Sequence, residues 1–133
     1  MRIMPDTNIL VSAILLDSKA MNELFKTIFK QHTLVLSGYT IKELFEVAEE
    51  KFPDKTGVIN RLLNRMPYEY INTPDEITPG LFDIRDPDDY PILYTAIKAN
   101  IDILITRDKD LLSVKIERPE IIKPHQFLER FYT

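Results

Sequence analysis

Residues 86–112 read DPDDYPILYTAIKANIDILITRDKDLL, and their pattern is the most informative indication of the fold class. Asp86 followed by Pro87 is a typical helix start, since aspartate caps a first turn and proline fits the first helical position. The apolar residues that follow recur at helical spacing and predict a helix over residues 88–99. Residues 103–105 form a short apolar run that predicts a buried strand. A helix leading into a buried strand is typical of a parallel sheet.

The same alternation extends along the rest of the chain. We predict strands near residues 2–4, 33–36, 69–71 and 121–122, and helices near residues 9–16, 18–30, 41–51, 55–65 and 124–131. Residues 72–87 are predicted to include a loop that borders the site. This order predicts the α/β class, with a three-layer α/β/α sandwich around a central, mainly parallel sheet of four or five strands. The length of 133 residues predicts a single domain over residues 1–133.

The composition narrows the chemistry that the chain supports. Hydrophobic residues make up 44% and charged residues 29%, which is typical of a folded globular protein. The absence of cysteine excludes disulfides, thiolate zinc sites and cysteine nucleophiles, and His32 and His125 are the only imidazoles. No signal peptide or membrane-spanning run is recognisable, so we expect a cytoplasmic protein without membrane contact.

The net charge of −4 argues at first against a nucleic-acid partner, because nucleic-acid-binding surfaces are usually basic. Acidic residues gathered in one metal site would make the total negative while a basic rim remains elsewhere, and bound cations reverse the local sign. The charge balance therefore lowers the expectation of nucleic-acid binding without excluding it.

Two aspartates come directly after predicted strands. Asp6 follows the first strand in Pro5-Asp6-Thr7-Asn8, and Asp108 follows the strand over residues 103–105. Each has a structural explanation as a helix N-cap. Each also follows the carboxyl end of a parallel strand, which is where open α/β sheets place their ligands. Their positions favour a shared site.

Glu43 lies near a predicted helix start and has two interpretations. The stretch Thr40-Ile41-Lys42-Glu43 matches a capping box, in which the glutamate reaches back to the N-cap backbone. Alternatively, Glu43 reaches a central site from the first turn of its helix, and Glu46 competes for that position. The spacing leaves both interpretations open.

Asp89 differs from the acids beside it. Asp86 and Asp88 are explained as simple helix caps near the positive end of the helix dipole. Asp89 shares a helical face with Leu93 and Ile97, the face expected to pack on the sheet. A carboxylate there is costly unless it is paired or bound to a metal.

As a set, four acids predict a metal site, namely Asp6, Glu43, Asp89 and Asp108. Clustered carboxylates raise each other's pKa values and are normally stabilised by a cation. Oxygen ligands without cysteine indicate Mg²⁺ or Mn²⁺, and one or two such ions would favour phosphodiester hydrolysis. In this interpretation Asp6 and Asp89 are principal ligands. Asp108 completes the metal shell or positions water, and Glu43 holds a second metal or a metal-bound water.

Four segments resemble the PIN-domain family, namely Asp6-Thr7-Asn8, residues 37–44, residues 86–96 and residues 106–112. The similarity is greatest to the prokaryotic VapC-like toxin components of toxin-antitoxin pairs. It implies a Mg²⁺- or Mn²⁺-dependent ribonuclease that cleaves single-stranded RNA and is restrained by an antitoxin protein. The family's acidic positions fall on Asp6, Glu43, Asp89 and Asp108, and the resemblance assigns supporting roles to Thr7, Asn8, Thr106 and Asp86.

Two positions depart from the family pattern. Pro5 replaces an apolar residue before the first aspartate, so the first strand must end there, because proline cannot donate to an internal ladder. Arg107 stands where small residues are common. Its guanidinium would contact a substrate phosphate or balance the neighbouring acids, and the sequence does not decide between the two.

Other functions remain open at this point. A phosphatase of the haloacid-dehalogenase type or a receiver domain would share the α/β class, although Asn8 stands where the phosphatase needs a second aspartate. A non-catalytic PIN-like scaffold that binds RNA or protein is the second alternative. Exposed apolar surface near the first helices would serve a homodimer or an antitoxin segment.

Overall fold

The central sheet has five parallel strands in residues 1–132, the part of the chain that this computed structural model describes. They are β1 (Arg2–Pro5), β2 (Thr33–Ser37), β3 (Glu69–Ile71), β4 (Ile103–Ile105) and β5 (Glu120–Ile122). Their order is β3-β2-β1-β4-β5, and Ile3 of the middle strand pairs with Leu34 on one side and Ile103 on the other. Because all pairings are parallel, the carboxyl ends of the strands meet at one edge.

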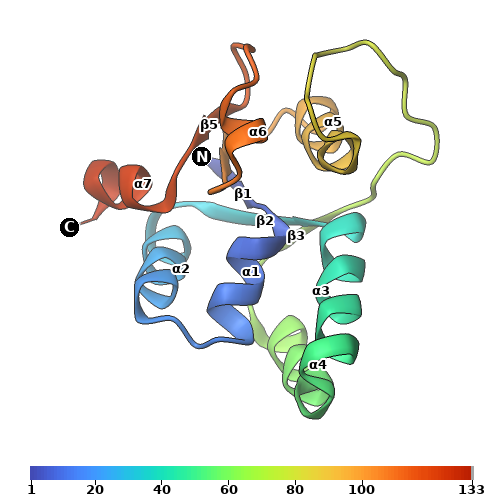
Figure 1. Cartoon of the computed structure of the whole chain (residues 1–133). Helices are drawn as coiled ribbons and strands as arrows, with labels where there is room; N and C mark the ends of the chain where they lie inside the picture. Colours follow the sequence, from blue (N-terminus) through green and yellow to red (C-terminus); the bar gives the residue numbers. More distant parts are fainter. Residues whose placement is uncertain (133) are drawn as a thin grey trace.

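Successive side chains of each strand point to opposite faces of the sheet. Ile3 and Met4 are both fully buried, yet they belong to two separate hydrophobic cores. Figure 1 shows helices covering both faces of the sheet. The predicted three-layer α/β/α sandwich is therefore confirmed.

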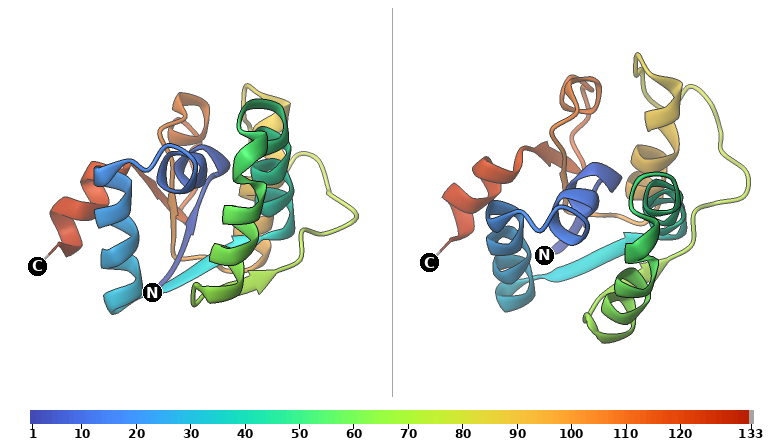
Figure 2. Two further views of the ribbon diagram at one scale, coloured as in Figure 1. Left: turned by 90° about the horizontal axis from the view of Figure 1, so that it is seen from below. Right: turned by 60° about the horizontal axis from the view of Figure 1, so that its bottom comes forward.

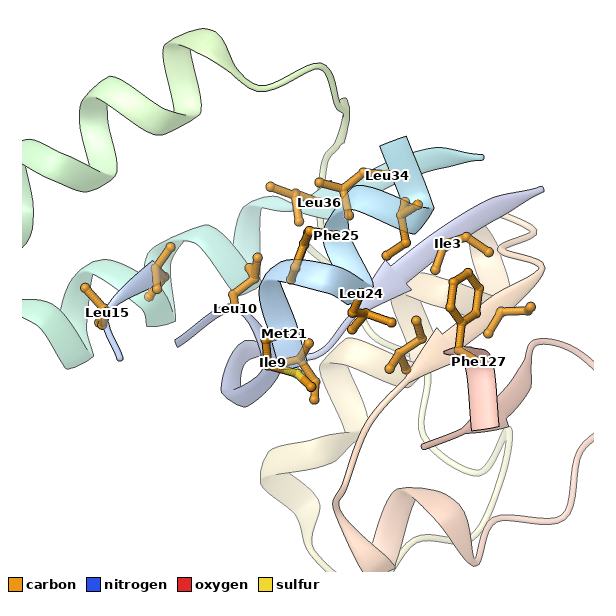
Figure 3. Close-up of a cluster of buried hydrophobic side chains, with 14 of the residues drawn as sticks. Ile3, Ile9, Leu10, Leu15, Met21, Leu24, Phe25, Leu34, Leu36 and Phe127 are labelled. Atoms are coloured by element: carbon orange, nitrogen blue, oxygen red, sulfur yellow. The ribbon is translucent and has the colours of Figure 1, made fainter. Parts of the chain in front are cut away.

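The larger helical layer packs on the face that Ile3 occupies. It contains α1 (Thr7–Ile14), α2 (Lys19–Gln31), α3 (Gly38–Lys51), α4 (Thr56–Arg65) and α7 (Pro124–Phe131), and the 3-10 turn η1 (Pro53–Lys55) joins α3 to α4. In this core Leu10 and Leu24 from the first two helices meet strand residues and Phe127 of α7 (Figure 3). α7 lies beside α2 (Figure 2), so the end of the chain closes the layer.

The smaller layer packs on the opposite face, around Met4 and Leu104. It contains the 3-10 turn η2 (Pro87–Asp89), α5 (Tyr90–Lys98) and the short α6 (Lys109–Leu112). The face of α5 predicted to pack on the sheet does so, since Leu93 is fully buried and Ile97, partly buried, packs against the same core. This layer holds the acidic segments 86–89 and 108–110 against the carboxyl edge of the sheet.

A long connection without regular secondary structure leads from β3 to α5, as predicted (Figure 1). Aromatic contacts fasten it to the helix. The rings of Phe82 and Tyr90 stack with their centroids 4.3 Å apart. The Tyr90 hydroxyl donates to the Thr78 carbonyl at 2.6 Å and accepts from the Leu81 N–H at 3.1 Å. The connection is thus held next to the start of α5.

The boundaries of two elements carry information about the sequence. β1 ends at Pro5, as the proline predicted. The third helix begins at Gly38, three residues earlier than the periodicity indicated.

None of the helices between residues 1 and 132 has both the length and the apolar character of a membrane span.

Candidate active site

A pocket of about 140 Å³ lies where the end of β1 meets segments of α1, α3, α5 and α6. All four acids predicted from the sequence line it, namely Asp6, Glu43, Asp89 and Asp108. Thr7 and Asn8, which were predicted to support them, line it as well. The fold therefore brings together residues that are up to 102 positions apart in the chain, as their numbers in the sequence show.

Asp6 is the most buried acid of the pocket, with 6% of its surface exposed. Its Oδ1 accepts from the Ile9 N–H at 3.0 Å, which is the predicted N-cap bond of α1, and its Oδ2 accepts from the Thr106 hydroxyl. Burial raises the pKa of Asp6 above its ordinary value, and these two hydrogen bonds oppose the rise. Both oxygens are thus held in place, and each retains a lone pair for another ligand.

Thr106 connects Asp6 to Asp108. Its fully buried hydroxyl donates to Asp6 and accepts from the Asp108 N–H at 2.9 Å. Asp108 then caps α6, since its Oδ1 accepts from the Asp110 N–H at 2.7 Å and the Leu111 N–H at 3.4 Å. The supporting position predicted for Thr106 therefore has a structural basis: one hydroxyl orients two of the acids.

Of the two interpretations left open for Glu43, the structure excludes the capping box. The N-cap of α3 is Ser37, whose Oγ accepts from the Thr40 N–H at 3.2 Å. Because the helix starts at Gly38, Glu43 lies beyond the first turn and out of reach of the cap. Its Oε1 instead accepts from the Thr7 hydroxyl at 2.5 Å, which ties α3 to the start of α1 inside the pocket.

Tyr39 and Val47 share the pocket-facing side of α3 with Glu43. Residues four apart lie on the same face of a helix, so this spacing was a signal that could have identified Tyr39 as a site residue. The Tyr39 hydroxyl donates to the Asp88 carbonyl at 3.2 Å. Burial, with the charges of Glu43 and Asp88, raises the pKa of Tyr39 to about 12, so its hydroxyl stays protonated.

Asp89 is the acid whose environment is most perturbed. It stands at the N-cap position of α5 but makes no capping bond, and its buried Oδ2 has no hydrogen-bond partner within residues 1–132. Burial, followed by the negative charges of Asp108 and Asp86, raises the pKa of Asp89 to about 7. A buried carboxylate oxygen without a donor is costly, and a cation would satisfy it.

The tightest group of acids differs from the predicted four. One oxygen each from Asp86, Asp89 and Asp110 lie within 4.8 Å of one another. Asp86 also caps η2 as predicted, through an Oδ1 that accepts from the Asp88 N–H at 3.0 Å. Asp110 was missed, although its position two residues after Asp108 was the available signal. The pocket and this trio share Asp89.

Arg85 occupies both oxygens of Asp110. Its Nε and Nη2 donate to the carboxylate at 2.8 and 2.7 Å, which is a bidentate pair. The hydrogen bond to Arg85 lowers the pKa of Asp110, so this carboxylate stays ionised while that of Asp89 is driven toward protonation. The sequence does not identify Arg85 as a site residue, because nothing in its local pattern indicates a contact 25 residues away.

Arg107 lines a different cavity from the acids that flank it in sequence. Its Nη2 contacts the Met21 sulfur at 3.5 Å, and it shares that second cavity with Lys123 and His125. Its charge still lowers the pKa of Asp6. The predicted balancing of neighbouring acids therefore has a basis, and a phosphate contact by Arg107 would lie outside the acidic pocket.

The donor set of the acidic pocket fits a hard divalent cation. The pocket offers carboxylate and hydroxyl oxygens and no sulfur or imidazole ligand among its lining residues. Its volume of about 140 Å³ far exceeds the roughly 10–15 Å³ that one water needs, which leaves room for an ion with water ligands. The buried Oδ2 of Asp89 has no hydrogen-bond partner among the described residues, and such an ion would satisfy it.

Comparisons with known proteins give one family and one fold. A family model described as the PIN domain matches residues 2–110. A chain of the crystal structure of VapBC2 from Rickettsia felis bound to a DNA fragment from their promoter is similar, with a TM-score of 0.68 and 22% sequence identity. The match covers 92% of this chain and 97% of that chain, and at this identity it shows a shared fold. No curated protein matches the sequence.

Proposed function

The chain belongs to the PIN-domain family, and on that premise we propose that it is a metal-dependent nuclease that hydrolyses phosphodiester bonds of single-stranded RNA. The nuclease domain would span residues 1–133. The observation that carries the proposal is the meeting of four acids in one pocket, where the Asp89 carboxylate keeps a buried oxygen without a partner in residues 1–132. A merely structural role for these acids would leave that oxygen unexplained.

Mg²⁺ or Mn²⁺ is the cofactor that the donor set favours. Asp6, Asp89 and Asp108 would hold it, with Glu43 directly or through water. When bound, such an ion lowers the pKa of a water and neutralises charge on the phosphate. Asp86 and Asp110 lie close enough to Asp89 to extend the ligand set, although Arg85 already engages Asp110.

The protein's own residues supply negatively charged carboxylates and hold them in position. The Thr106 hydroxyl fixes Asp6 and the backbone of Asp108 together, and the Thr7 hydroxyl fixes Glu43. Preorganised carboxylates need no rearrangement when a substrate arrives, which is the main way an enzyme lowers an electrostatic barrier. Asp89, whose pKa is raised to about 7 by burial and neighbouring acids, would give up a proton when a cation binds.

Cleavage of a mixed single-stranded RNA tests the nuclease proposal. We expect cleavage by the purified chain with Mn²⁺ or Mg²⁺, and a loss of roughly a hundredfold or more for Asp6→Asn and Asp89→Asn. Asp83→Asn is the matched control, because Asp83 is exposed and lies outside the residues that line the pocket. Cleavage that survives chelation, or undiminished activity of both pocket variants, would refute the mechanism.

We also propose that the chain is the toxin component of a toxin-antitoxin pair. The resemblance to VapC-like sequences and the fold shared with a chain of the VapBC2 structure support this assignment. Co-expression with the product of an adjacent small open reading frame should yield a stable complex with suppressed ribonuclease activity. A chain that remains fully active with that product, and forms no complex with it, would count against a toxin role.

A further inference from the structure

A second cavity of about 370 Å³ lies beside the start of α7. Three side chains that can carry positive charge line it: Arg107 from the connection between β4 and α6, Lys123 just before α7, and His125 in its first turn. The other lining residues carry no charge, namely Ala20, Met21, Pro124 and Leu128. In a chain with a net charge of −4, this is a local reversal of sign.

The charge of Arg107 lowers the pKa of Asp6, but no carboxylate of the described residues is in ion-pair contact with the cations of this cavity. Neither Arg107 nor Lys123 forms an ion pair with a carboxylate in residues 1–132. Other arginines do pair in this way, namely Arg2, Arg85, Arg118 and Arg130. The Arg107 guanidinium contacts the thioether of Met21, which is a weak acceptor. Strong donors are therefore left available to an anion in the cavity.

The backbone at the start of α7 adds a further donor. Pro124 has no N–H, and the N–H groups of Gln126 and Phe127 both donate to the Lys123 carbonyl at 3.1 Å. The Lys123 N–H donates to the Gln126 side chain at 2.8 Å, which leaves the His125 N–H at the positive end of the helix without an acceptor among the described residues. An anion would complement both this N–H and the helix dipole.

We propose that this cavity binds a phosphate of a nucleic-acid strand whose neighbouring segment occupies the acidic pocket. The inference rests on the proposed nuclease function, because it states where the substrate continues. Arg107 directly precedes Asp108, and consecutive Cα atoms are about 3.8 Å apart, so one stretch of backbone borders both sites. Arginine is suited to phosphate, since its planar donors engage two oxygens at once.

Binding of a fluorescent single-stranded RNA tests the proposal. Anisotropy is measured in Ca²⁺ at several salt concentrations, with the intact length of the probe checked on a gel. We expect Arg107→Gln to weaken binding roughly three- to tenfold and to lower the salt slope by about 0.7, the value for one lost phosphate contact to a single strand. Lys123→Gln should act in the same direction.

The controls are two exposed cations elsewhere. Arg65 ends α4, which Figure 2 shows on the opposite side of the molecule from α7, and Lys51 ends α3. Arg65→Gln and Lys51→Gln should bind RNA like the unmodified chain. Arg107→Lys should keep the salt slope and lose part of the affinity, because the charge remains while bidentate contact is lost.

The source of the phosphate is tested separately. Inorganic phosphate is titrated against the complex and should displace the RNA only at concentrations far above that of the oligonucleotide. Displacement at equal phosphate concentration would identify a small-anion site and overturn the proposal, as would an unchanged slope for Arg107→Gln or an absence of RNA binding. If the variants lose binding and the intact chain never cleaves RNA, the nuclease function fails while this phosphate site stands.

Discussion

Asp89→Asn should change the stability of the protein in opposite directions with and without metal. In the metal-free protein the substitution removes the charge of a carboxylate whose buried Oδ2 has no partner among the described residues. In the metal-bound protein it removes a ligand. Few structural explanations of Asp89 predict such a reversal, so the measurement separates a metal site from a simple helix start.

The magnitude follows from the pKa of Asp89, which rises from 3.8 to about 7. A rise of this size corresponds to about 4 kcal/mol of disfavoured ionisation, and solvent screening of this partly buried group reduces it to about 1–2 kcal/mol. Since the folded pKa lies above the unfolded one, the folded state binds more protons between pH 4 and 7. The contribution of Asp89 to metal-free stability should therefore fall as the pH rises through this range, and Asp89→Asn should lack that part of the pH dependence.

Urea unfolding at pH 5 and pH 8, with and without Mn²⁺, is the assay. At pH 8 without metal, Asp89→Asn should be more stable than the unmodified chain by about 1–2 kcal/mol. With Mn²⁺ at a hundred times its dissociation constant, the unmodified chain should gain about 2.7 kcal/mol and the variant much less. Asp83→Asn should behave like the unmodified chain. If Mn²⁺ leaves the stability of the unmodified chain unchanged, or if Asp89→Asn is the less stable protein at pH 8 without metal, Asp89 does not have this role.

Three further outcomes are expected. Thr106→Val should lower the free energy of unfolding in urea by about 1–3 kcal/mol and remove most of the nuclease activity, because it leaves Asp6 without its hydroxyl donor. Thr106→Ser should retain the stability and the activity, and an equal loss in the two variants would contradict this. Glu43→Gln should reduce RNA cleavage strongly and Glu46→Gln, on an exposed side chain one turn away, should not; equal activities would remove Glu43 from the site. His32→Phe should stabilise the chain at pH 5 more than at pH 8, because burial lowers the pKa of His32 and its ring nitrogens lack partners in the described chain. Urea midpoints that shift equally at both pH values would contradict this pH dependence.

The fold was predictable because each strand and helix has a recognisable local sequence pattern. The buried strands are short apolar runs, and residues such as Ile3 and Met4 show that both sides of the sheet had to be covered. The helices repeat at 3.6 residues. What periodicity alone did not locate was the start of α3, because the cap at Ser37 precedes the first apolar position of the stripe. Because the helix starts three residues earlier than the periodicity indicated, the capping-box interpretation of Glu43 does not hold.

The candidate site was predictable only as far as strand ends could show. Asp6 and Asp108 follow strands, and a parallel sheet gathers such residues at one edge. The Arg85–Asp110 pair depends on the end of the connection from β3 lying close to α6, which no local pattern encodes. The side of the backbone on which Arg107 emerges is likewise a property of the packed chain, and it decides that this cation serves a second cavity.

Helix capping and metal ligation are compatible roles for these acids, because a carboxylate has more acceptor positions than capping uses. An ionised carboxylate has about four lone-pair positions, and capping uses one or two. Asp108 caps α6 through Oδ1 alone, and Asp86 caps η2 in the same way. Capping therefore orients these acids without exhausting them. Asp89 caps nothing, and it is also the acid with the unpartnered buried oxygen. Because an asparagine oxygen can still cap, Asp→Asn variants remove the charge while keeping the helix start, and any effect they have on metal binding belongs to the ligand role.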